Sequence, residues 1–533
     1  MGSVVSTYVR SALLSLGEKG WRTQGPSWAC FAVYGLLAAN LSTTLLQYTS
    51  FVVDALGYPY EIDYGEGIVW QQAELILSAH AYADIAQYPY IVFHYPPIYH
   101  LLVRTISVLS VDILTVGRGL SVTATCIIIA LIGWLVAHGT DNSSQRVTII
   151  AGPLAGLLLL TFTPVQVWSL LMRVDMVALS FSLGGVACAV ASLRRPTLLY
   201  AAVFLFVLAV FTKQTLVAAP LATLSIVLVR TPRQGARAVA FGVVLGGGAL
   251  AALASATGGG FVRHIFLYNL NRFDFNIAID ATLMWLCIYA VYAGLVAIAL
   301  MGRWRLLRPE WQGLSGAVHL IRHDDNAAWS TIMAAYLILA TASLATAGKS
   351  GAAENYFLEW FSVICIWLGV GIAQSLAAIG QQNTRRPLPG RILAAVLVPF
   401  ALLAQQIGQP SLIPRLHAGL VAPANLQAGD AMLELLRGIR GPVLSEEMVL
   451  LLRAGKQVSL EPAIFAELAA TGRWQEAHLL DMLNNHVFGA VITVGGPGDA
   501  PFNARYLPRT QAAILDAYPK VQAYGNYQVR LPN

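Results

Sequence analysis

Long apolar segments recur along most of the chain and determine its predicted architecture. Each is close to the roughly 20 mainly apolar residues that a membrane-spanning helix needs. The segments are residues 28–48, 118–138, 148–168, 175–193, 197–212, 216–229, 238–257, 281–300, 328–347, 356–377 and 391–408. They predict a polytopic α-helical membrane protein with about 11 transmembrane helices in a domain spanning residues 28–409.

Positive charges gather in every second connection between these segments. Arg10, Lys19 and Arg22 precede the first segment, which favours a cytoplasmic N-terminal segment over residues 1–27. Alternation from there places the other arginines on the same side: Arg146; Arg194 and Arg195; Arg230, Arg233 and Arg237; Arg303, Arg305 and Arg308; Arg385, Arg386 and Arg391. We therefore expect a multi-pass protein of the inner (plasma) membrane with its N-terminus in the cytoplasm.

One apolar stretch, residues 98–111, is too short for a confident span and contains Arg104. Counting it as a span would move every later arginine cluster to the outer side. It is therefore predicted to be an interfacial or re-entrant helix within a long first outer loop, residues 54–117. A twelfth span is the alternative interpretation.

The composition changes after Gln409. Residues 410–533 have ordinary charge and frequent Pro and Gly, with helical periodicity over 425–437, 462–471 and 474–485. Strand-like runs are 442–444, 457–460, 490–494 and 521–530, and the Gly495–Gly498 run is predicted to be a turn. This region is predicted to be a small soluble α/β domain on the periplasmic, extracytoplasmic side.

Composition narrows the class of protein. Among the 533 residues, 57% are hydrophobic and 11% charged, and the mean hydropathy is +0.63. This excludes a soluble enzyme, a disordered scaffold and a nucleic-acid-binding module. The net charge of +6 fits cytoplasmic loops, and the five cysteines show no spacing typical of disulfides or zinc sites.

The most informative polar stretch is Asp63-Tyr64-Gly65-Glu66-Gly67 in the first outer loop. A helix starting near Asp63 would place Asp63 and Glu66 on one face, where a carboxylate with a raised pKa suits general-base catalysis. The alternative is structural: Asp63 caps the helix and Glu66 completes a capping box. Both interpretations are open.

Isolated cations at outer ends of the apolar segments are candidate phosphate ligands. A charge near membrane depth costs about 2.5–3.5 kcal/mol on insertion scales, so it tends to face a cavity. These candidates are Lys213, Arg173 and Lys349, with His94 as a weaker one. The alternatives are a snorkelling role for Lys213 and pairing of Arg173 with Asp175. Candidate residues lining the substrate are Tyr95, Tyr99, Asp175, Glu354 and Tyr356.

Three features resemble the GT-C membrane glycosyltransferases, in particular the group containing protein O-mannosyltransferases and lipid A aminoarabinose transferase. They are the acidic motif of Asp63 and Glu66, the run Tyr95-Pro96-Pro97-Ile98-Tyr99, and Arg173-Val174-Asp175-Met176. Together they cover residues 28–195.

The resemblance implies a sugar donor linked to polyprenyl phosphate, at the outer membrane surface. It also implies an inverting displacement, in which a carboxylate deprotonates the acceptor hydroxyl and basic residues hold the departing phosphate. The acceptor is a lipid, a glycan or a protein. Many family members have adjacent Asp and Glu, whereas Tyr64 and Gly65 separate them here. We favour Asp63 as the base, although alignment on the following helix matches Glu66 to the family's glutamate.

Other features stay open at this level. Acidic motifs in some GT-C enzymes bind a divalent cation, but no second Asp-x-Asp cluster is present here, and we predict no metal-binding residues. Two other classes compete with a transferase: a lipid or sugar transporter (flippase), and a non-catalytic subunit of a glycan-assembly complex. The halves of the chain show no symmetry that would favour a transporter.

Overall fold

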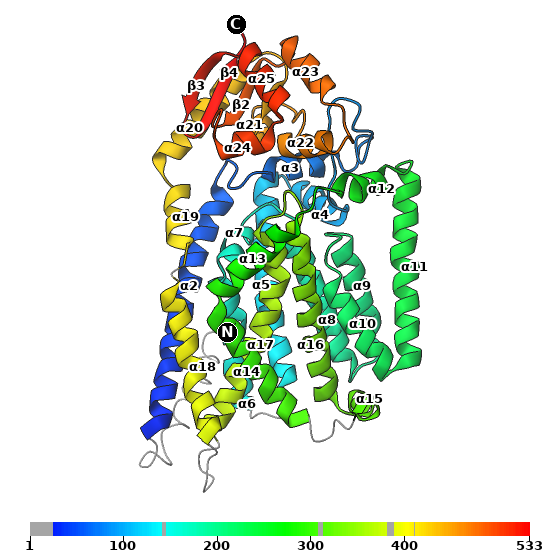
Figure 1. Ribbon diagram of the computed structural model, residues 1–533, viewed down its shortest axis with the longest axis vertical. Coiled ribbons are helices and arrows are strands. Elements are labelled where there is room, and N and C mark those ends of the chain that lie inside the picture. Colours follow the sequence, from blue (N-terminus) through cyan, green and yellow to red (C-terminus); the bar gives the residue numbers. More distant parts are fainter. Residues whose placement is uncertain (1–24, 141–144, 308–312, 381–388, 410) are drawn as a thin grey trace.

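The computed structural model describes residues 25–140, 145–307, 313–380, 389–409 and 411–533 (Figure 1). Helices dominate the first four hundred residues. They are α2 (Gly25–Gly57), α3 (Glu66–Leu75), α4 (Ile98–Ser107), α5 (Ile113–Gly139), α6 (Gln145–Leu158), α7 (Thr163–Trp168), α8 (Asp175–Ser192), α9 (Leu198–Val210), α10 (Ala218–Arg230), α11 (Pro232–Ala256), α12 (Gly260–Ile265), α13 (Phe275–Ile288), α14 (Ala290–Leu307), α15 (Gly313–His323), α16 (Asp325–Ser343), α17 (Leu358–Gly380) and α18 (Pro389–Gly408).

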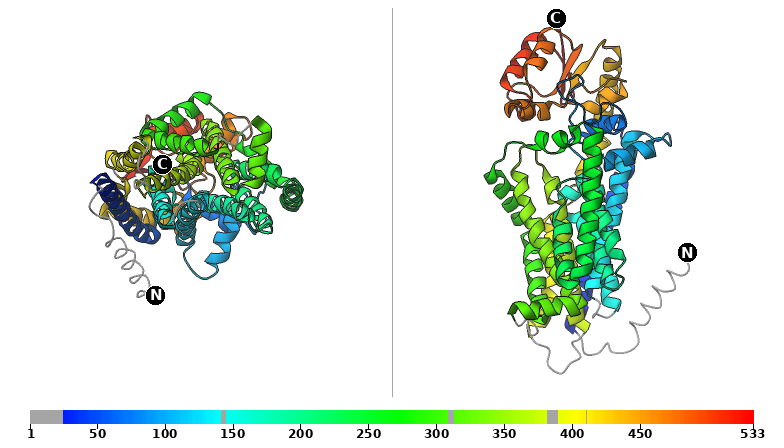
Figure 2. Two further views of the ribbon diagram at one scale, coloured as in Figure 1. Left: turned by 90° about the horizontal axis from the view of Figure 1, so that it is seen from below. Right: turned by 90° about the vertical axis from the view of Figure 1, so that its right-hand side faces the viewer.

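The long helices form one bundle, and a smaller domain lies on one end of it (Figures 1 and 2). α17 is apolar on all sides and packs against α5, α6, α14 and α18, so it forms the centre. α11 lies at the edge, mostly exposed, against α9 and α10. Apolar side chains that face outward from a bundle this hydrophobic are compatible with lipid, and the protein is an integral membrane protein.

Each of the eleven predicted apolar segments is helical in the structure, but their lengths differ. Within the described residues, six helices are long and apolar enough to cross a membrane, and a bent pair makes a seventh. Shorter apolar helices cover 145–161, 198–210 and 218–230. The predicted cytoplasmic residues Arg10, Lys19, Arg22, Arg308, Arg385 and Arg386 lie outside the described residues.

Two predicted helices are interrupted. The segment 281–300 is not one straight helix, because α13 and α14 meet at 82° around Tyr289. The break frees the carbonyl of Ile288, which accepts hydrogen bonds from Gln405 Nε2 at 2.9 Å and Gln409 Nε2 at 2.7 Å. The segment 148–168 is likewise divided into α6, a short 3-10 turn and α7.

The first outer loop contains two short helices, α3 and α4, at the end of the bundle nearest the small domain (Figure 1). α4 has ten residues, fewer than a span needs, and a strongly amphipathic pattern. It is thus a short helix and not a full span, and its location at the membrane interface stays a prediction.

The chain ends in a four-stranded sheet covered by short helices. The strands are β1 (Val443–Ser445), β2 (Ala490–Val494), β3 (Lys520–Tyr524) and β4 (Tyr527–Leu531), in the order β1-β2-β4-β3, with β1 parallel to β2 and the other pairs antiparallel. The helices are α19 (Ile413–Leu420), α20 (Pro423–Gly438), α21 (Met448–Arg453), α22 (Pro462–Ala470), α23 (Ala477–Asn484), α24 (Ala500–Arg505) and α25 (Pro508–Ala517).

Two strand predictions in this domain are wrong in detail. Residues 457–460 are extended but pair with no strand, because Val458 bonds Gln71 of α3 through both its backbone groups. Residues 521–530 form a hairpin, since Gly525 adopts a positive φ of 56° between β3 and β4.

The small domain shares its apolar core with the first outer loop. Ile85, Tyr90 and Val92 pack into the same cluster as Phe465, Trp474 and other side chains of the terminal domain. The backbone N–H of Tyr90 also donates to the carbonyl of Ser459 at 2.8 Å. The loop that carries the acidic motif is therefore held between the bundle and the terminal domain.

Candidate active site

The acidic motif forms a tight turn ahead of α3. Gly65 adopts φ 99°, a left-handed conformation that favours glycine, and the helix begins only at Glu66. Asp63 therefore lies before the helix and its side chain does not cap it; Glu61 Oε1 instead accepts from the N–H of Gly67 in the first turn at 3.3 Å. The predicted helix start at Asp63 and the capping-box alternative are both wrong, because the turn at Gly65 separates the two carboxylates.

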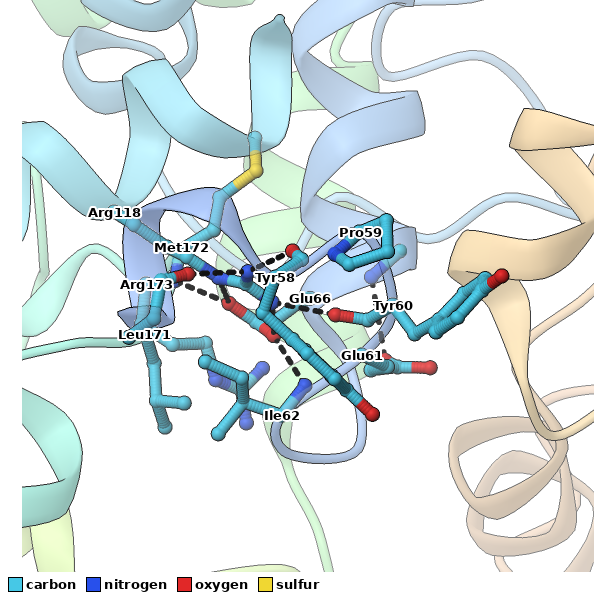
Figure 3. Close-up of polar contacts among 12 residues, drawn as sticks. Tyr58, Pro59, Tyr60, Glu61, Ile62, Glu66, Arg118, Leu171, Met172 and Arg173 are labelled. Atoms are coloured by element: carbon cyan, nitrogen blue, oxygen red, sulfur yellow. Dashed lines mark hydrogen bonds and ion pairs between the residues drawn. The ribbon is translucent and has the colours of Figure 1, made fainter. Parts of the chain in front are cut away.

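Glu66 lies in a fully buried ion pair with Arg118 of α5 (Figure 3). Its Oε1 accepts from Arg118 Nε at 2.9 Å and from the N–H of Met172 at 2.8 Å. Its Oε2 accepts from Arg118 Nη2 and from the N–H of Ile62, both at 2.7 Å. Each carboxylate oxygen already accepts two hydrogen bonds, and the side chain is excluded from solvent. Glu66 therefore has no free position for a substrate hydroxyl.

Arg118 is equally saturated. Besides Glu66, its guanidinium donates to the carbonyls of Ala55 at 2.9 Å, Tyr58 at 2.6 Å and Tyr60 at 2.7 Å, so all five N–H groups are bonded. The pair fixes the end of α2, the acidic loop and α5 to one another. Arg118 is the first residue of the predicted apolar segment 118–138. A charge at that position is the sequence feature that could have indicated a buried partner.

Within the described residues, Asp63, unlike Glu66 and Arg118, has an unbonded side chain. Its carboxylate makes no hydrogen bond or ion pair with any part of the chain that the structure describes, and it borders a cavity. Burial raises the pKa of Asp63, Arg173 opposes that shift, and the nearby carboxylates of Glu66 and Glu354 add to it. A partly buried, unpaired carboxylate with a raised pKa suits proton abstraction.

Arg173 lies directly beside the acidic loop. Its Nη1 is 3.5 Å from the carbonyl oxygen of Gly65, and its guanidinium lies 5.2 Å from the ring centre of Trp168. Its Nε is buried without a hydrogen-bond partner, and no carboxylate of the described chain forms an ion pair with it. The guanidinium is therefore available to an anion next to Asp63.

Asp175 and Lys213 form a second, buried ion pair. Oδ1 of Asp175 also accepts from Asn355 Nδ2 at 2.8 Å, and Lys213 Nζ lies 5.2 Å from the ring centre of Tyr356. Because its charge is already neutralised by Asp175, Lys213 is a weaker phosphate ligand than the sequence predicts. Asp175 Oδ2 is buried and unbonded.

His94 and Lys349 lie near Arg173, and both form a hydrogen bond with Asn269. The carbonyl of His94 accepts from Gln214 Nε2 at 3.0 Å and from Asn269 Nδ2 at 3.1 Å, and Lys349 Nζ donates to Asn269 Oδ1 at 3.4 Å. Burial lowers the pKa of His94 to about 3, so its ring is neutral at pH 7 and supplies no positive charge. Lys349 has no carboxylate partner within the described chain.

The remaining predicted residues divide into two groups. Tyr95 lies within electrostatic reach of Arg173, Asp175 and Lys213, and Glu354 is exposed within reach of Asp63. Tyr99 does not line the site: it is fully buried, and its hydroxyl donates to the carbonyl of Gly117 at 3.1 Å.

The terminal domain clamps the acidic loop on the far side. Glu61 accepts from the N–H groups of Gly65 at 2.6 Å and Met448 at 3.2 Å, and its carboxyl contacts that of Glu447. Burial raises the pKa of both carboxyls; the contact adds to the rise for Glu61 and opposes it for Glu447. The hydroxyl of Tyr64 donates to Glu461. Sequence reasoning missed these residues because their partners are almost four hundred positions away.

Metal-ion ligands do not cluster in the described residues. No group of three or more His, Cys, Asp or Glu side chains is placed to hold an ion there. Asp63 has one free carboxylate and no neighbour oriented to share an ion with it, so we derive no step through a metal.

Comparison with known proteins gives a fold. The sequence matches no known protein-family model and no curated protein. The structure is similar to a crystal structure of ArnT from Cupriavidus metallidurans bound to undecaprenyl phosphate, with TM-score 0.54, 12% identity, and coverage of 93% of this chain and 98% of that chain. The apo crystal structure of the same protein gives TM-score 0.47 and 13% identity over 94% of this chain and 98% of that chain. The chain shares the fold of ArnT.

Proposed function

We propose that the protein is an inverting glycosyltransferase that moves a sugar from a polyprenyl-phosphate donor to an acceptor hydroxyl at the outer membrane surface. The observation that carries this proposal is the juxtaposition of Asp63 and Arg173: within the described residues the Asp63 carboxylate makes no hydrogen bond or ion pair, and Arg173 has no carboxylate in an ion pair with it. A base and an anion-binding group side by side are what a displacement from a phosphate-linked sugar requires.

Asp63 is the proposed base. It takes the proton of the acceptor hydroxyl as the hydroxyl oxygen attacks the anomeric carbon of the donor. The bond from that carbon to the phosphate oxygen breaks, and the electron pair leaves with polyprenyl phosphate. A single displacement of this kind inverts the anomeric configuration.

Arg173 and Lys349 are the proposed phosphate ligands. Neither cation has a carboxylate partner in the described chain, so each can stabilise the negative charge that develops on the leaving phosphate. Lys213 and Asp175 form an ion pair within electrostatic reach of Arg173, and Asn355 and Tyr356 contact that pair. The undecaprenyl phosphate bound to ArnT supports a polyprenyl-phosphate lipid as the carrier.

We also propose eleven membrane spans, with the shorter apolar helices and α18 completing the count. The arginines of the short loops support a cytoplasmic location for the end of the bundle opposite the terminal domain. The terminal domain and the candidate site then face the periplasm.

The test is sugar transfer by the full chain in proteoliposomes supplied with a panel of polyprenyl-phosphate-linked monosaccharides. Release of polyprenyl phosphate and incorporation of sugar are both measured, with and without a chelator. Asp63→Asn is expected to lower turnover by about 10²–10⁴-fold, the usual contribution of a general base. Asp516→Asn, at an exposed position of α25, is the matched control.

Unchanged turnover in Asp63→Asn contradicts the proposed base. Lipid or sugar flux across the membrane, without release of polyprenyl phosphate by the unaltered chain, would instead identify a transporter. Loss of activity with the chelator, restored by a divalent cation, would show that the reaction depends on a metal ion, and activity that survives the chelator would show that it does not.

A further inference from the structure

A cavity of about 470 Å³ lies where the bundle meets the terminal domain. It is enclosed by the outer end of α2, by α19 and α20, and by the β3–β4 hairpin. Its volume is within the range of about 300–1,000 Å³ that small-molecule sites occupy. Arg173, Lys213 and Lys349 do not line it, so it is a separate compartment from the proposed phosphate site.

The wall of this cavity combines apolar and polar side chains. Phe51, Val167, Leu170 and Leu416 come from the bundle and from α19, and Leu420, Met432 and Leu450 add apolar surface from the helices that follow. The polar part of the wall consists of tyrosines and amides: Tyr58, Tyr60, Tyr524, Tyr527, Asn425 and Asn526. Such a wall fits a molecule with an apolar part and a hydroxyl-rich part.

Every charged side chain that lines the cavity is acidic. Among the described residues these are Asp63, Glu61 and Glu447, and there is no lysine or arginine. Carboxylates in a partly buried site attract hydroxyl and amino groups and repel phosphates and carboxylates, because like charges brought together there cost several kcal/mol.

Asp63 connects this cavity to the phosphate site. It lines the cavity, and Arg173 is the cation that lowers its pKa most. A hydroxyl bound in the cavity would thus face the base from one side and the donor from the other.

We infer that this cavity binds the acceptor, and that the acceptor is a polyhydroxylated headgroup without negative charge, attached to an apolar anchor. Calling the bound molecule an acceptor rests on the proposed function. The binding itself does not require catalysis. It excludes acceptors whose reacting part carries phosphate or carboxylate groups.

The test uses the full chain in nanodiscs of phosphatidylcholine, without any donor. The probe is an alkyl glucoside that carries a photoreactive diazirine in its chain, and cross-linked peptides are mapped by mass spectrometry. Cross-links are expected in α2, α19 and the segment around Leu170. Unlabelled dodecyl glucoside should compete better than dodecyl glucoside 6-phosphate, by about tenfold or more.

Matched variants test the two walls separately. Leu416→Trp fills the apolar part and should abolish these cross-links, whereas Ile407→Trp, on the exposed face of α18, should not. Asn526→Lys adds a cation at the polar end and should improve competition by the 6-phosphate. Asn503→Lys, an exposed position outside the cavity, should leave it unchanged.

Cross-links confined to other segments overturn the inference, as does equal or better competition by the 6-phosphate in the unaltered chain. Either result leaves donor cleavage untouched, since that reaction is measured separately through Asp63→Asn. Conversely, an inactive donor assay with cavity cross-links intact would count against the proposed reaction while supporting the binding site.

Discussion

Arg118 and Glu66 lie in contact with both side chains excluded from solvent, and Nη2 of Arg118 is 2.7 Å from Oε2 of Glu66. Every polar atom of the pair is bonded, three carbonyls and two backbone N–H groups included. This arrangement assigns Glu66 to holding the acidic loop, although in sequence it is as strong a candidate for the base as Asp63.

Glu66→Gln is therefore expected to destabilise the protein rather than only slow its reaction. It leaves the charge of Arg118 buried without a partner, which typically costs about 3–5 kcal/mol. The measurement is the unfolding temperature of the purified chain in detergent, with Glu434→Gln, an exposed position of α20, as control. An inactive Glu66→Gln variant with an unchanged unfolding temperature would instead indicate that Glu66 takes part in the reaction.

The acid limb of the pH profile is expected to report Asp63. The active form is the carboxylate, so activity falls as pH decreases through its pKa. Because burial raises that pKa, the loss begins at a higher pH than for an ordinary aspartate of about 3.9. Arg173 lowers the pKa of Asp63, so Arg173→Gln should shift the acid limb further upward. A limb that moves downward in this variant would contradict the assignment.

Arg173 and Lys349 should also determine donor binding. Loss of a hydrogen bond to a charged group costs about 1.5–3 kcal/mol, so either variant to Gln should raise KM for the donor by about 10–150-fold. Inhibition by free polyprenyl phosphate should weaken in parallel. Arg233→Gln, at an exposed position in the first turn of α11, controls for general effects of losing an arginine. Wild-type inhibition by polyprenyl phosphate in both site variants would refute their role.

Contact between α3 and the terminal domain should be sensitive to one methyl group. A Cβ at Gly67 would lie 2.5 Å from Cβ of Met448 and 2.6 Å from the backbone N of Val449. Gly67→Ala is thus expected to separate the acidic loop from α21 and to lower turnover. Hydrogen exchange in residues 448–453 should rise, whereas Gly57→Ala, which has open space around it, should behave as wild type. Unaltered exchange in Gly67→Ala would show that this contact does not hold the loop.

The Glu61–Glu447 contact should weaken with increasing pH. Both folded-state pKa values are raised, so the contact is stable when the pair holds a proton and loses stability as pH rises through those values. Glu447→Gln removes one charge and should make the protection factors of residues 61–67, which are corrected for the intrinsic pH dependence of amide exchange, depend less on pH. In the wild-type chain these protection factors should fall as pH rises, and constant wild-type protection factors would argue against a shared proton.

The sequence was sufficient for the helical architecture and for most of the site. Asp63, Arg173, Lys213 and Lys349 stood out because charges are rare in such an apolar chain, and each lies near the same end of the bundle. What separates their roles is pairing: Asp175 neutralises Lys213, whereas Arg173 has no carboxylate. Pairing depends on helix packing, which a linear pattern does not contain.

Glu66, Tyr99 and Arg118 illustrate the same limit. The spacing of Asp63 and Glu66 fits one helical face, yet the left-handed turn at Gly65 separates them. Tyr99 belongs to a recognisable proline-tyrosine run and is nevertheless a buried packing residue. Arg118 was included in a predicted span, and only the contact with Glu66 explains how its charge is tolerated.

The contacts between the terminal domain and the acidic loop have a consequence for biosynthesis. Glu447, Glu461, Met448 and Val458 all belong to the last hundred residues, whereas the loop that they hold is made near the start of the chain. During synthesis the loop therefore lacks these contacts until nearly the whole polypeptide has been translated and its last part translocated. A prematurely terminated chain would insert its helices into the membrane but would lack the side chains that hold the acidic loop, so the loop can be fully ordered only in the finished molecule.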